Sequence, residues 1–278
     1  MTTVFVTGAS GALGQALIQQ LSDTGLTVIA GSRTPKPQPG IQAVAFDYDR
    51  PQTFEALKGV DKLVMIPRPA DVIADQVMIP VIEAAKAAGV KQIVLSTALG
   101  VDANEEAPLR KVEKALFASG LDYTVVRPSW FFDNFLKPGE VASIRQGVLV
   151  APASDGKGSF IAARDIAAAI IAALLDSRHN GAAYTLTGPQ AVTHAEVAAA
   201  LSSALGHEVS HLNIAPDEYG ALLIKAGLTD SQVGFYQFLY ELTRVGVFGA
   251  VTSDLEAMTG QPGQDLAGFV AEHRAAWQ

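Results

Sequence analysis

The sequence has no cysteine among its 278 residues. This absence excludes disulfides, zinc sites built on thiolates and cysteine nucleophiles. Basic residues are also in deficit, because 20 Lys and Arg stand against 28 Asp and Glu, which gives a formal net charge of -8. Nucleic acids and anionic membranes repel an acidic protein at long range, so we expect neither as a partner.

No uninterrupted apolar run is long enough to cross a membrane, which takes about 18 residues. The longest candidate, residues 160–175, contains Arg164 and Asp165. We interpret it as a short buried strand that ends near Ala163 and is followed by an amphipathic helix. The chain begins without the basic region and apolar run of a secretory signal, so we expect a cytoplasmic location.

What the sequence does have is hydrophobic residues, 49% of the total, in short apolar runs that alternate with helical segments. This alternation predicts a parallel sheet. The runs are continuously apolar, as in strands covered by helices on both faces, so the predicted fold class is α/β, a doubly wound Rossmann fold. Where a helix ends before a strand, the chain places Gly25, Gly59, Gly89 and Gly120. The predicted strands are 4–7, 27–30, 42–46, 62–66, 92–96 and 123–126.

After Pro128 the pattern changes to shorter predicted strands mixed with helices and loops. We predict an NAD(P)-binding Rossmann domain over residues 1–150, to which a strand and helix segment near 159–188 returns. Residues 189–278 are expected to form a smaller, mostly helical substrate lobe that packs closely on this domain. The shorter strands are predicted at 148–150, 183–187 and 208–214, and the helices of 216–278 are separated by Gly227, Gly246, Gly249 and the break at 261–263.

The strongest functional signal is the glycine loop TGASGALG at residues 7–14, which follows an apolar strand and opens a helix. Gly8 permits a tight turn, Gly11 lets the backbone approach a pyrophosphate, and Gly14 allows the helix to pack on the strand. The helix amides and dipole stabilise the negative charge. An ordinary glycine-rich turn is the alternative, but the flanking strands favour a dinucleotide site. Its predicted contacts are Gly8, Ser10, Gly11, Ala12, Leu13 and Gly14.

The end of the second predicted strand indicates which dinucleotide is bound. An NAD enzyme usually has Asp or Glu there to bind the ribose hydroxyls, whereas this chain has Ser32 and Arg33. The guanidinium of Arg33 suits a 2′-phosphate, with Ser32 and Lys36 as further donors. We therefore predict NADPH as the cofactor. The alternative is that Arg33 is a solvated surface residue.

Further residues follow the third, fourth and fifth predicted strands. Open α/β sheets bind ligands at the carboxyl ends of their strands, so these residues are expected to line the cofactor groove. Each of them could equally be a loop residue that caps a helix, and Arg68 could be an exposed charge. The residues are Asp47, Tyr48, Ile66, Pro67, Arg68, Ser96 and Thr97.

These segments together resemble the NmrA-like branch of the atypical short-chain dehydrogenase/reductases. The similarity covers most of the first 190 residues and rests on the glycine loop, Ser32-Arg33 and three later segments. The branch includes NADPH-dependent quinone reductases, triphenylmethane dye reductases, ergot-alkaloid reductases and a non-catalytic redox-sensing regulator. The resemblance thus implies the fold and the cofactor more firmly than the reaction. The later segments are IVLSTALG, VEKALFASGLDYTVVRPSWFFDNF and FIAARDIAAAIIAALL.

The chain departs from this superfamily on the predicted helix 107–119. Classical members carry Tyr and Lys there, as proton donor and orienting cation, and these positions align with Leu109 and Glu113. The nearby Arg110, Lys111 and Lys114 are interpreted as a solvated face. We therefore assign no catalytic residue.

Without a strong acid, hydride transfer is easiest to electron-poor acceptors such as quinones, iminium ions and conjugated dyes. The sequence therefore predicts an NADPH-dependent oxidoreductase of this kind, and the alternative is a cofactor-binding regulator without chemistry. Trp130, Phe131 and Asn134 are candidates for binding a flat acceptor, although aromatic packing between the lobes explains them as well. Ser96 or Thr97 could donate a weak hydrogen bond to the reduced oxygen.

Two other features invite a different interpretation. Residues 207–211 read His-Glu-Val-Ser-His and match the HExxH pattern of zinc proteases. That pattern needs a helix, and we expect an extended strand, so we predict no metal site. The aromatic run 235–240 could cover a pocket, form the face of a homodimer or lie in the core, and we favour the core.

Overall fold

The computed structural model describes residues 2–278, which fall into two compact units. The chain leaves unit 1 at Pro128 and not at the predicted residue 150. The reason is that Phe132, Phe135, Ile144 and Leu149 are buried in the core of unit 2. Unit 1 comprises the described residues up to Pro128, Ala163–Leu186 and Ala257–Gly260, and unit 2 comprises Ser129–Ala162, Thr187–Glu256 and Gln261–Gln278.

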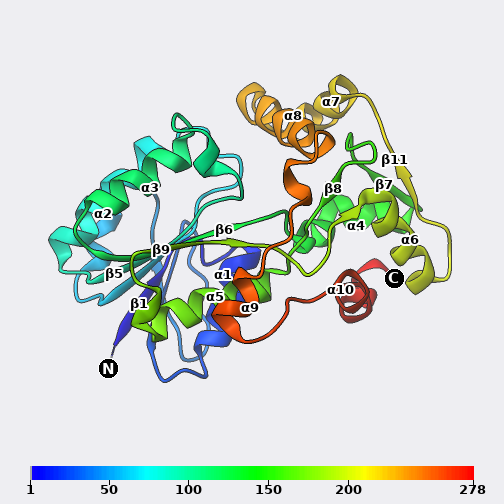
Figure 1. Ribbon diagram of the computed structural model, residues 1–278. Coiled ribbons are helices and arrows are strands. Elements are labelled where there is room, and N and C mark those ends of the chain that lie inside the picture. Colours follow the sequence, from blue (N-terminus) through cyan, green and yellow to red (C-terminus); the bar gives the residue numbers. More distant parts are fainter. Residues whose placement is uncertain (1) are drawn as a thin grey trace. The chain divides into compact units, whose positions relative to one another are not determined.

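Unit 1 is built on a seven-stranded parallel sheet with the strand order β3-β2-β1-β4-β5-β6-β9 (Figure 1). The predicted Rossmann fold is thereby confirmed. The order reverses between β1 and β4, and open α/β sheets bind their ligands at such a switch point. The strands are β1 (Thr3–Val6), β2 (Thr27–Ser32), β3 (Gln42–Ala45), β4 (Lys62–Met65), β5 (Gln92–Ser96), β6 (Asp122–Pro128) and β9 (Ala182–Leu186).

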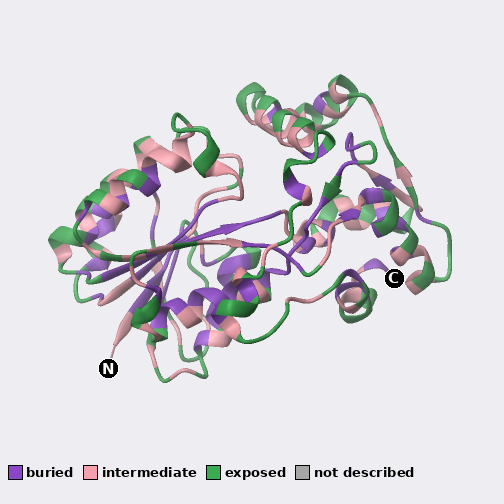
Figure 2. Ribbon diagram, in the orientation of Figure 1, coloured by how far each residue is buried: buried purple, intermediate pink, exposed green. Residues whose placement is uncertain are grey.

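Helices cover both faces of this sheet, which is why its inner strands are apolar without alternation (Figure 2). On one face, Leu63 and Met65 of β4 join a core with Met78 of α2 and Val112 of α3. Val64, between them, points to the other face, where α1 and α5 pack together. The helices of unit 1 are α1 (Ala12–Leu21), η1 (Pro51–Leu57), α2 (Ala74–Ala88), η2 (Val101–Ala103), α3 (Pro108–Ala118), α5 (Ala163–Leu175) and η4 (Ser177–His179).

The four glycines predicted between helices and strands all have positive φ, from 72° at Gly25 to 88° at Gly89. At Gly89 the left-handed residue follows α2 directly and donates its N–H to the carbonyls of Ala85 and Lys86. This closes the helix in the manner that the sequence indicated.

Unit 2 has two small strand pairs and a separate aromatic core. β7 and β11 pair in parallel, whereas β8 and β10 pair antiparallel. Phe132 lies at the centre of the core, stacked on Phe160 at 5.5 Å and on Phe269 at 5.0 Å. The elements are η3 (Phe132–Leu136), α4 (Pro138–Arg145), β7 (Val148–Val150), β8 (Lys157–Gly158), β10 (Val192–Thr193), α6 (His194–Leu205), β11 (Ser210–Leu212), α7 (Pro216–Lys225), α8 (Asp230–Arg244), η5 (Val247–Gly249), α10 (Leu266–His273) and η6 (Arg274–Trp277), and α9 (Asp254–Thr259) is divided between the two units.

Two predictions for this part of the chain are wrong. The buried strand expected before Ala163 is only an isolated bridge, between Ile161 and Phe131. The pairing does not extend beyond this one bridge, so the apolar run is a buried loop and not a strand. The aromatic run 235–240 belongs to α8 and is not all core, because Phe238 is 54% exposed.

Across residues 2–278, the helices are all too short or too polar to span a membrane.

Candidate cofactor site

The glycine loop forms a tight cradle at the end of β1. Gly8 has φ of +61°, and its carbonyl accepts a hydrogen bond from the Gly11 N–H at 3.0 Å. A Cβ on Gly14 would lie 2.3 Å from the Gly8 carbonyl oxygen, so only glycine lets α1 begin so close to β1. Gly11 is the N-cap of α1 and offers no side-chain cap. The first amides of the helix are therefore open to a ligand.

Beyond the loop, Ser10, Gly11 and Ala12 are exposed, whereas Leu13 and Gly14 are buried. The exposed backbone can meet a pyrophosphate, and Leu13 anchors the helix in the core. A dinucleotide fits this arrangement because free N–H groups and the helix dipole converge on an open surface.

The end of β2 lies beside the same loop, since the Ala9 N–H donates to the Gly31 carbonyl at 3.1 Å. Ser32 is buried, but Arg33 and Lys36 are exposed. Neither cation forms an ion pair with a carboxylate anywhere in residues 2–278. Arg33, which follows β2, thus lies directly after the strand beside the glycine loop and has no ion pair within the described residues, and its role as a ligand of a 2′-phosphate, with Lys36, stays a prediction.

Tyr48 is a core residue and not an exposed one. Its hydroxyl lies 2.8 Å from the Thr7 hydroxyl and donates to the Ile66 carbonyl at 3.0 Å, and burial raises the pKa of this phenol. The hydroxyl therefore ties the ends of β1 and β4 together. Asp47, its neighbour, accepts a hydrogen bond from the Asp49 N–H at 3.1 Å, which is a turn contact.

The residues after β4 differ in what they contact. Ile66 packs over the glycine loop, because a Cβ on Gly8 would lie 3.2 Å from its own Cβ. Pro67 follows it, half-buried. Arg68 donates from Nε to Asp71 at 2.7 Å and from Nη1 to Asp49. Two carboxylates thus balance this charge, which weakens its interpretation as a phosphate ligand.

Ser96 and Thr97 are both buried at the carboxyl end of β5. The Thr97 hydroxyl donates to Glu113 Oε1 at 2.9 Å. A threonine has one hydroxyl proton, so in this arrangement Thr97 cannot also donate to a reduced oxygen, contrary to our expectation. Ser96 stays a candidate for that donation.

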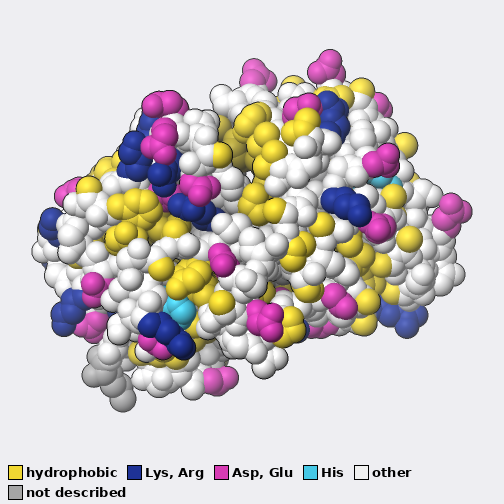
Figure 3. Space-filling model, viewed as in Figure 1, with side chains coloured by type: hydrophobic (Ala, Val, Ile, Leu, Met, Phe, Trp, Pro, Cys, Tyr) yellow, Lys and Arg dark blue, Asp and Glu magenta, His cyan; other side chains and the backbone are white. Residues whose placement is uncertain are grey.

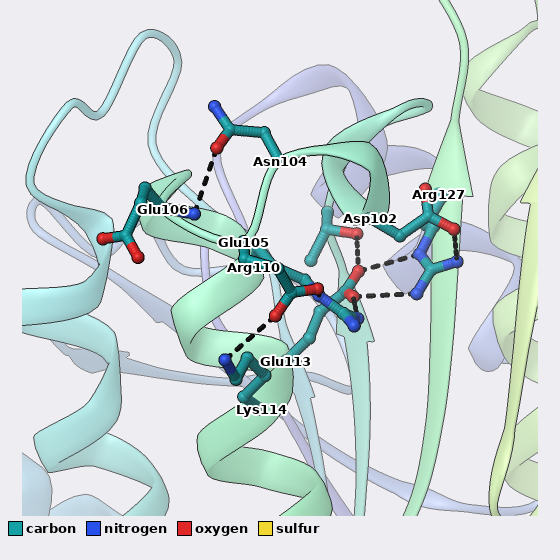
Figure 4. A network of polar contacts seen from close by, with 9 residues as sticks. Asp102, Asn104, Glu105, Glu106, Arg110, Glu113, Lys114 and Arg127 are labelled. Atoms are coloured by element: carbon teal, nitrogen blue, oxygen red, sulfur yellow. Dashed lines mark hydrogen bonds and ion pairs between the residues drawn. The ribbon is translucent and has the colours of Figure 1, made fainter.

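Glu113 is the residue that sequence reasoning missed. Its side chain is fully buried on α3 and accepts four hydrogen bonds, from Thr97, from Arg127 Nε and Nη2, and from Arg110 Nη1 (Figure 4). Arg127 also donates to Asp102 at 2.6 Å. The signal in the sequence was an arginine inside the apolar strand 122–128, since a buried charge requires a partner.

The charged face of α3 is only partly solvated. Lys111 and Lys114 pair with Glu106 and Glu105 on the surface, as expected of a solvated face. The side chain of Arg110 is only 19% exposed and reaches the buried Glu113. Figure 3 shows basic and acidic side chains interspersed over this part of the surface, at the upper left.

The predicted acceptor-binding residues belong to unit 2. Trp130 donates from Nε1 to the Thr243 hydroxyl at 3.2 Å, and its ring lies 5.4 Å from that of Tyr240. Phe131 bridges to Ile161, and Asn134 lies in η3. Trp130 thus packs within unit 2, and its binding of an acceptor stays a prediction.

The His-Glu-Val-Ser-His segment is not helical, and its last two residues, Ser210 and His211, lie in the strand β11, which is shorter than the predicted strand 208–214. The His211 Nε2 lies 2.9 Å from the Ala151 carbonyl. The helical spacing that the HExxH pattern needs is therefore not formed. Within the described residues, His, Asp and Glu form no group of three that could hold a metal ion.

Comparison with known proteins identifies the family of the chain. Residues 8–177 match the model of a family described as NAD(P)H-binding. The chain is 33% identical to the NAD(P)H azoreductase of Xenophilus azovorans, and the alignment covers 99% of both chains.

Solved structures resemble the whole chain. NADPH-dependent quinone oxidoreductase QOR2 from Escherichia coli, solved with NADPH, has a TM-score of 0.81 at 29% identity and covers 97% of this chain and 99% of its own. Triphenylmethane reductase from Citrobacter sp., solved with NADP(H), has a TM-score of 0.80 at 25% identity with the same coverage. The transcriptional regulator NmrA shares the fold alone, with a TM-score of 0.74 at 17% identity over 98% of this chain and 94% of its own. The chain therefore belongs to the NAD(P)H-binding family.

Proposed function

We propose that the protein is an NADPH-dependent reductase that passes a hydride to an electron-poor small molecule, such as a quinone, an iminium ion or a conjugated dye. The observation that carries this proposal is the glycine loop with open helix amides, flanked by the unpaired cations Arg33 and Lys36. The named activities of the azoreductase and of the quinone and dye reductases support it.

The preference for NADPH over NADH follows from charge. Arg33 can form charge-assisted hydrogen bonds to a 2′-phosphate, each contributing about 1.5 to 3 kcal/mol. Arg33 is exposed, and solvent and salt screen such a contact, so we take the lower end of the range. This corresponds to roughly tenfold discrimination.

The class of acceptor follows from the shortage of acids in unit 1. Leu109 cannot donate a proton, Glu113 is held by two arginines, and Tyr48 is bound to Thr7 in the core. When bound, NADPH supplies a hydride from its nicotinamide ring. An iminium carbon that gains this hydride becomes a neutral amine with no proton needed, and a reduced quinone anion can take its proton from water. A simple ketone would need an acid that these groups do not supply.

We further propose a division of labour between the units. Unit 1 binds the cofactor, because the glycine loop and the two cations lie in it. Unit 2 would bind the acceptor through Trp130, Phe131 and Asn134, with the flat indole as the natural platform for a conjugated ring.

The proposal is tested by following the absorbance of NADPH while purified protein is mixed in turn with quinones, cyclic imines and cationic dyes. We expect oxidation with at least one class, and oxidation about tenfold slower with NADH below saturation. The exposed variant Lys58→Gln, whose ion pair with Glu55 lies far along the chain from the site, should react as the unmodified protein does. Tight binding of NADPH without oxidation by any acceptor would contradict a reductase and favour a cofactor-sensing regulator.

A further inference from the structure

The direction of one buried hydrogen bond is fixed by the charges around it. Glu113 accepts two hydrogen bonds from Arg127 and one from Arg110, so guanidinium donors occupy both oxygens of its carboxyl group and both oxygens act as acceptors. The proton in the 2.9 Å contact between Thr97 and Glu113 must therefore be that of the Thr97 hydroxyl. Because this proton is used, the oxygen of the buried Thr97 hydroxyl can only accept a hydrogen bond from a further group.

Further ion pairs fix this arrangement in turn. Arg127 is held by Asp102, and Arg110 and Lys114 are both held by Glu105 (Figure 4). Three basic and two further acidic side chains thus surround the Glu113 carboxylate, which has no exposed surface, and the three positive and three negative charges of the network balance. The network joins η2, α3 and β6 to the residue that follows β5, so Thr97 cannot turn without breaking it.

Thr97 lies where the second half of a dinucleotide would reach. β4 is the strand next to both β1 and β5, and Ile66 at its end packs on Gly8 of the glycine loop. Neighbouring strands are about 4.8 Å apart, so Thr97 is on the order of 10 Å from the loop. A dinucleotide whose pyrophosphate sits on the loop extends across the switch point over this distance.

We propose that Glu113 is a positioning residue that fixes the Thr97 oxygen as an acceptor for an N–H or O–H group on the nicotinamide riboside half of NADPH. The inference takes from the proposed function only that the protein binds NADPH. It assigns Thr97 to cofactor binding and not to the reaction of the acceptor. The donor on the cofactor is either the carboxamide N–H or a ribose hydroxyl.

The test measures dissociation constants by fluorescence titration, so it needs no turnover. Thr97→Val removes the hydroxyl at nearly constant volume, and we expect a three- to tenfold weaker binding of NADPH, the effect of losing one hydrogen bond. Thr97→Ser should bind NADPH as the unmodified protein does. Adenosine 2′,5′-bisphosphate, which lacks the nicotinamide riboside, should bind equally to all three proteins and also reports that they are folded.

Two further ligands identify the donor. The 3-acetylpyridine analogue of NADP⁺ replaces the carboxamide nitrogen by a methyl group, and 2′-phospho-ADP-ribose keeps the ribose hydroxyls without the base. If the Thr97→Val penalty disappears with the acetylpyridine analogue, the carboxamide is the donor. If the penalty persists with both ligands, the donor is a ribose hydroxyl.

Glu113→Gln tests the positioning role. It should weaken NADPH binding by a similar factor, and adding Thr97→Val to it should cost little more, because residues that act through one another are not additive. Lys111→Gln, on the same helix but in an exposed pair with Glu106, is the matched control and should change nothing.

Equal affinity of Thr97→Val and the unmodified protein for NADPH would overturn the inference. So would an equal loss of affinity for adenosine 2′,5′-bisphosphate, because that loss would be structural. If no acceptor is reduced but the Thr97 variants bind NADPH as expected, the proposed reaction is contradicted and this inference is supported.

Discussion

Replacing two glycines of the glycine loop by alanine should have different effects, on thermal stability at Gly14 and on NADPH binding at Gly11. At Gly14 the new Cβ would lie 2.3 Å from the Gly8 oxygen and 2.7 Å from the Ala9 Cα, and both are backbone atoms that cannot turn aside. At Gly11 the nearest atom is the Gly8 oxygen at 3.4 Å, and φ of -80° suits any residue. Gly14 is therefore needed for packing, and Gly11 is needed only for what binds outside.

The magnitudes follow from these contacts. Overpacking of a buried contact costs about 1 to 3 kcal/mol, and Gly14→Ala belongs at the upper end because the backbone must move. Gly11→Ala costs at most about 1 kcal/mol as a poorer N-cap. For a protein of this size about 1 kcal/mol lowers Tm by roughly 2 to 4 °C, so Gly14→Ala should melt some 6 °C or more below the unmodified protein.

Binding should show the opposite order. A methyl group on the exposed Gly11 lies where the backbone would approach the pyrophosphate, and losing one charge-assisted hydrogen bond there raises the Kd of NADPH about tenfold. The assays are calorimetric melting without cofactor and fluorescence titration with NADPH. If Gly14→Ala melts with the unmodified protein, or if Gly11→Ala binds NADPH normally, the assignment of packing and ligand roles is refuted.

Three further predictions concern charge. Arg33→Ala should weaken NADPH about tenfold and leave NADH nearly unchanged in parallel titrations, and equal losses would remove Arg33 from the phosphate site. Burial lowers the pKa of His194 to about 3, so between pH 6.5 and 3 the unfolded chain binds more protons and the free energy of unfolding falls as pH falls, by about 2 kcal/mol at pH 5. Denaturant titrations at pH 7 and 5 should show this loss, and His194→Phe should abolish it. Arg127→Met should cost about 3 kcal/mol or more because it leaves the buried Glu113 short of two donors, and the double variant with Glu113→Leu should recover part of that in the same titrations.

Local constraints made much of unit 1 readable in the sequence. The glycine loop, the parallel strands and the positive φ at the glycines after helices depend on a residue and its near neighbours along the chain. The lack of a carboxylate at Arg33 likewise needs no knowledge of the rest of the molecule. The parallel strands and the glycine conformations were predicted correctly because turn geometry and strand burial restrict which residues can occupy them.

Other features depend on which elements meet. The apolar run 160–163 has the composition of a strand, but only Phe131 bridges to it, and β structure requires a partner strand. Tyr48 looked like a groove residue, yet its hydroxyl is used in the core by Thr7 and Ile66. The residues next to 160–163 or to Tyr48 in the sequence give no information about these contacts, because the contacting residues come from distant parts of the chain.

The sequence by itself determined the features from which we predict a cofactor site, namely a glycine loop, an arginine after the second strand and a parallel sheet that carries both. Only the tertiary structure decided which groups contact Glu113, the residue that the sequence places at the position of the lysine. Glu113 and Arg127 are 14 residues apart, on a helix and a strand, and the residues around each of them do not indicate that the two form a pair. Their pairing exists because α3 packs on β6, where a buried charge is stable only beside its opposite.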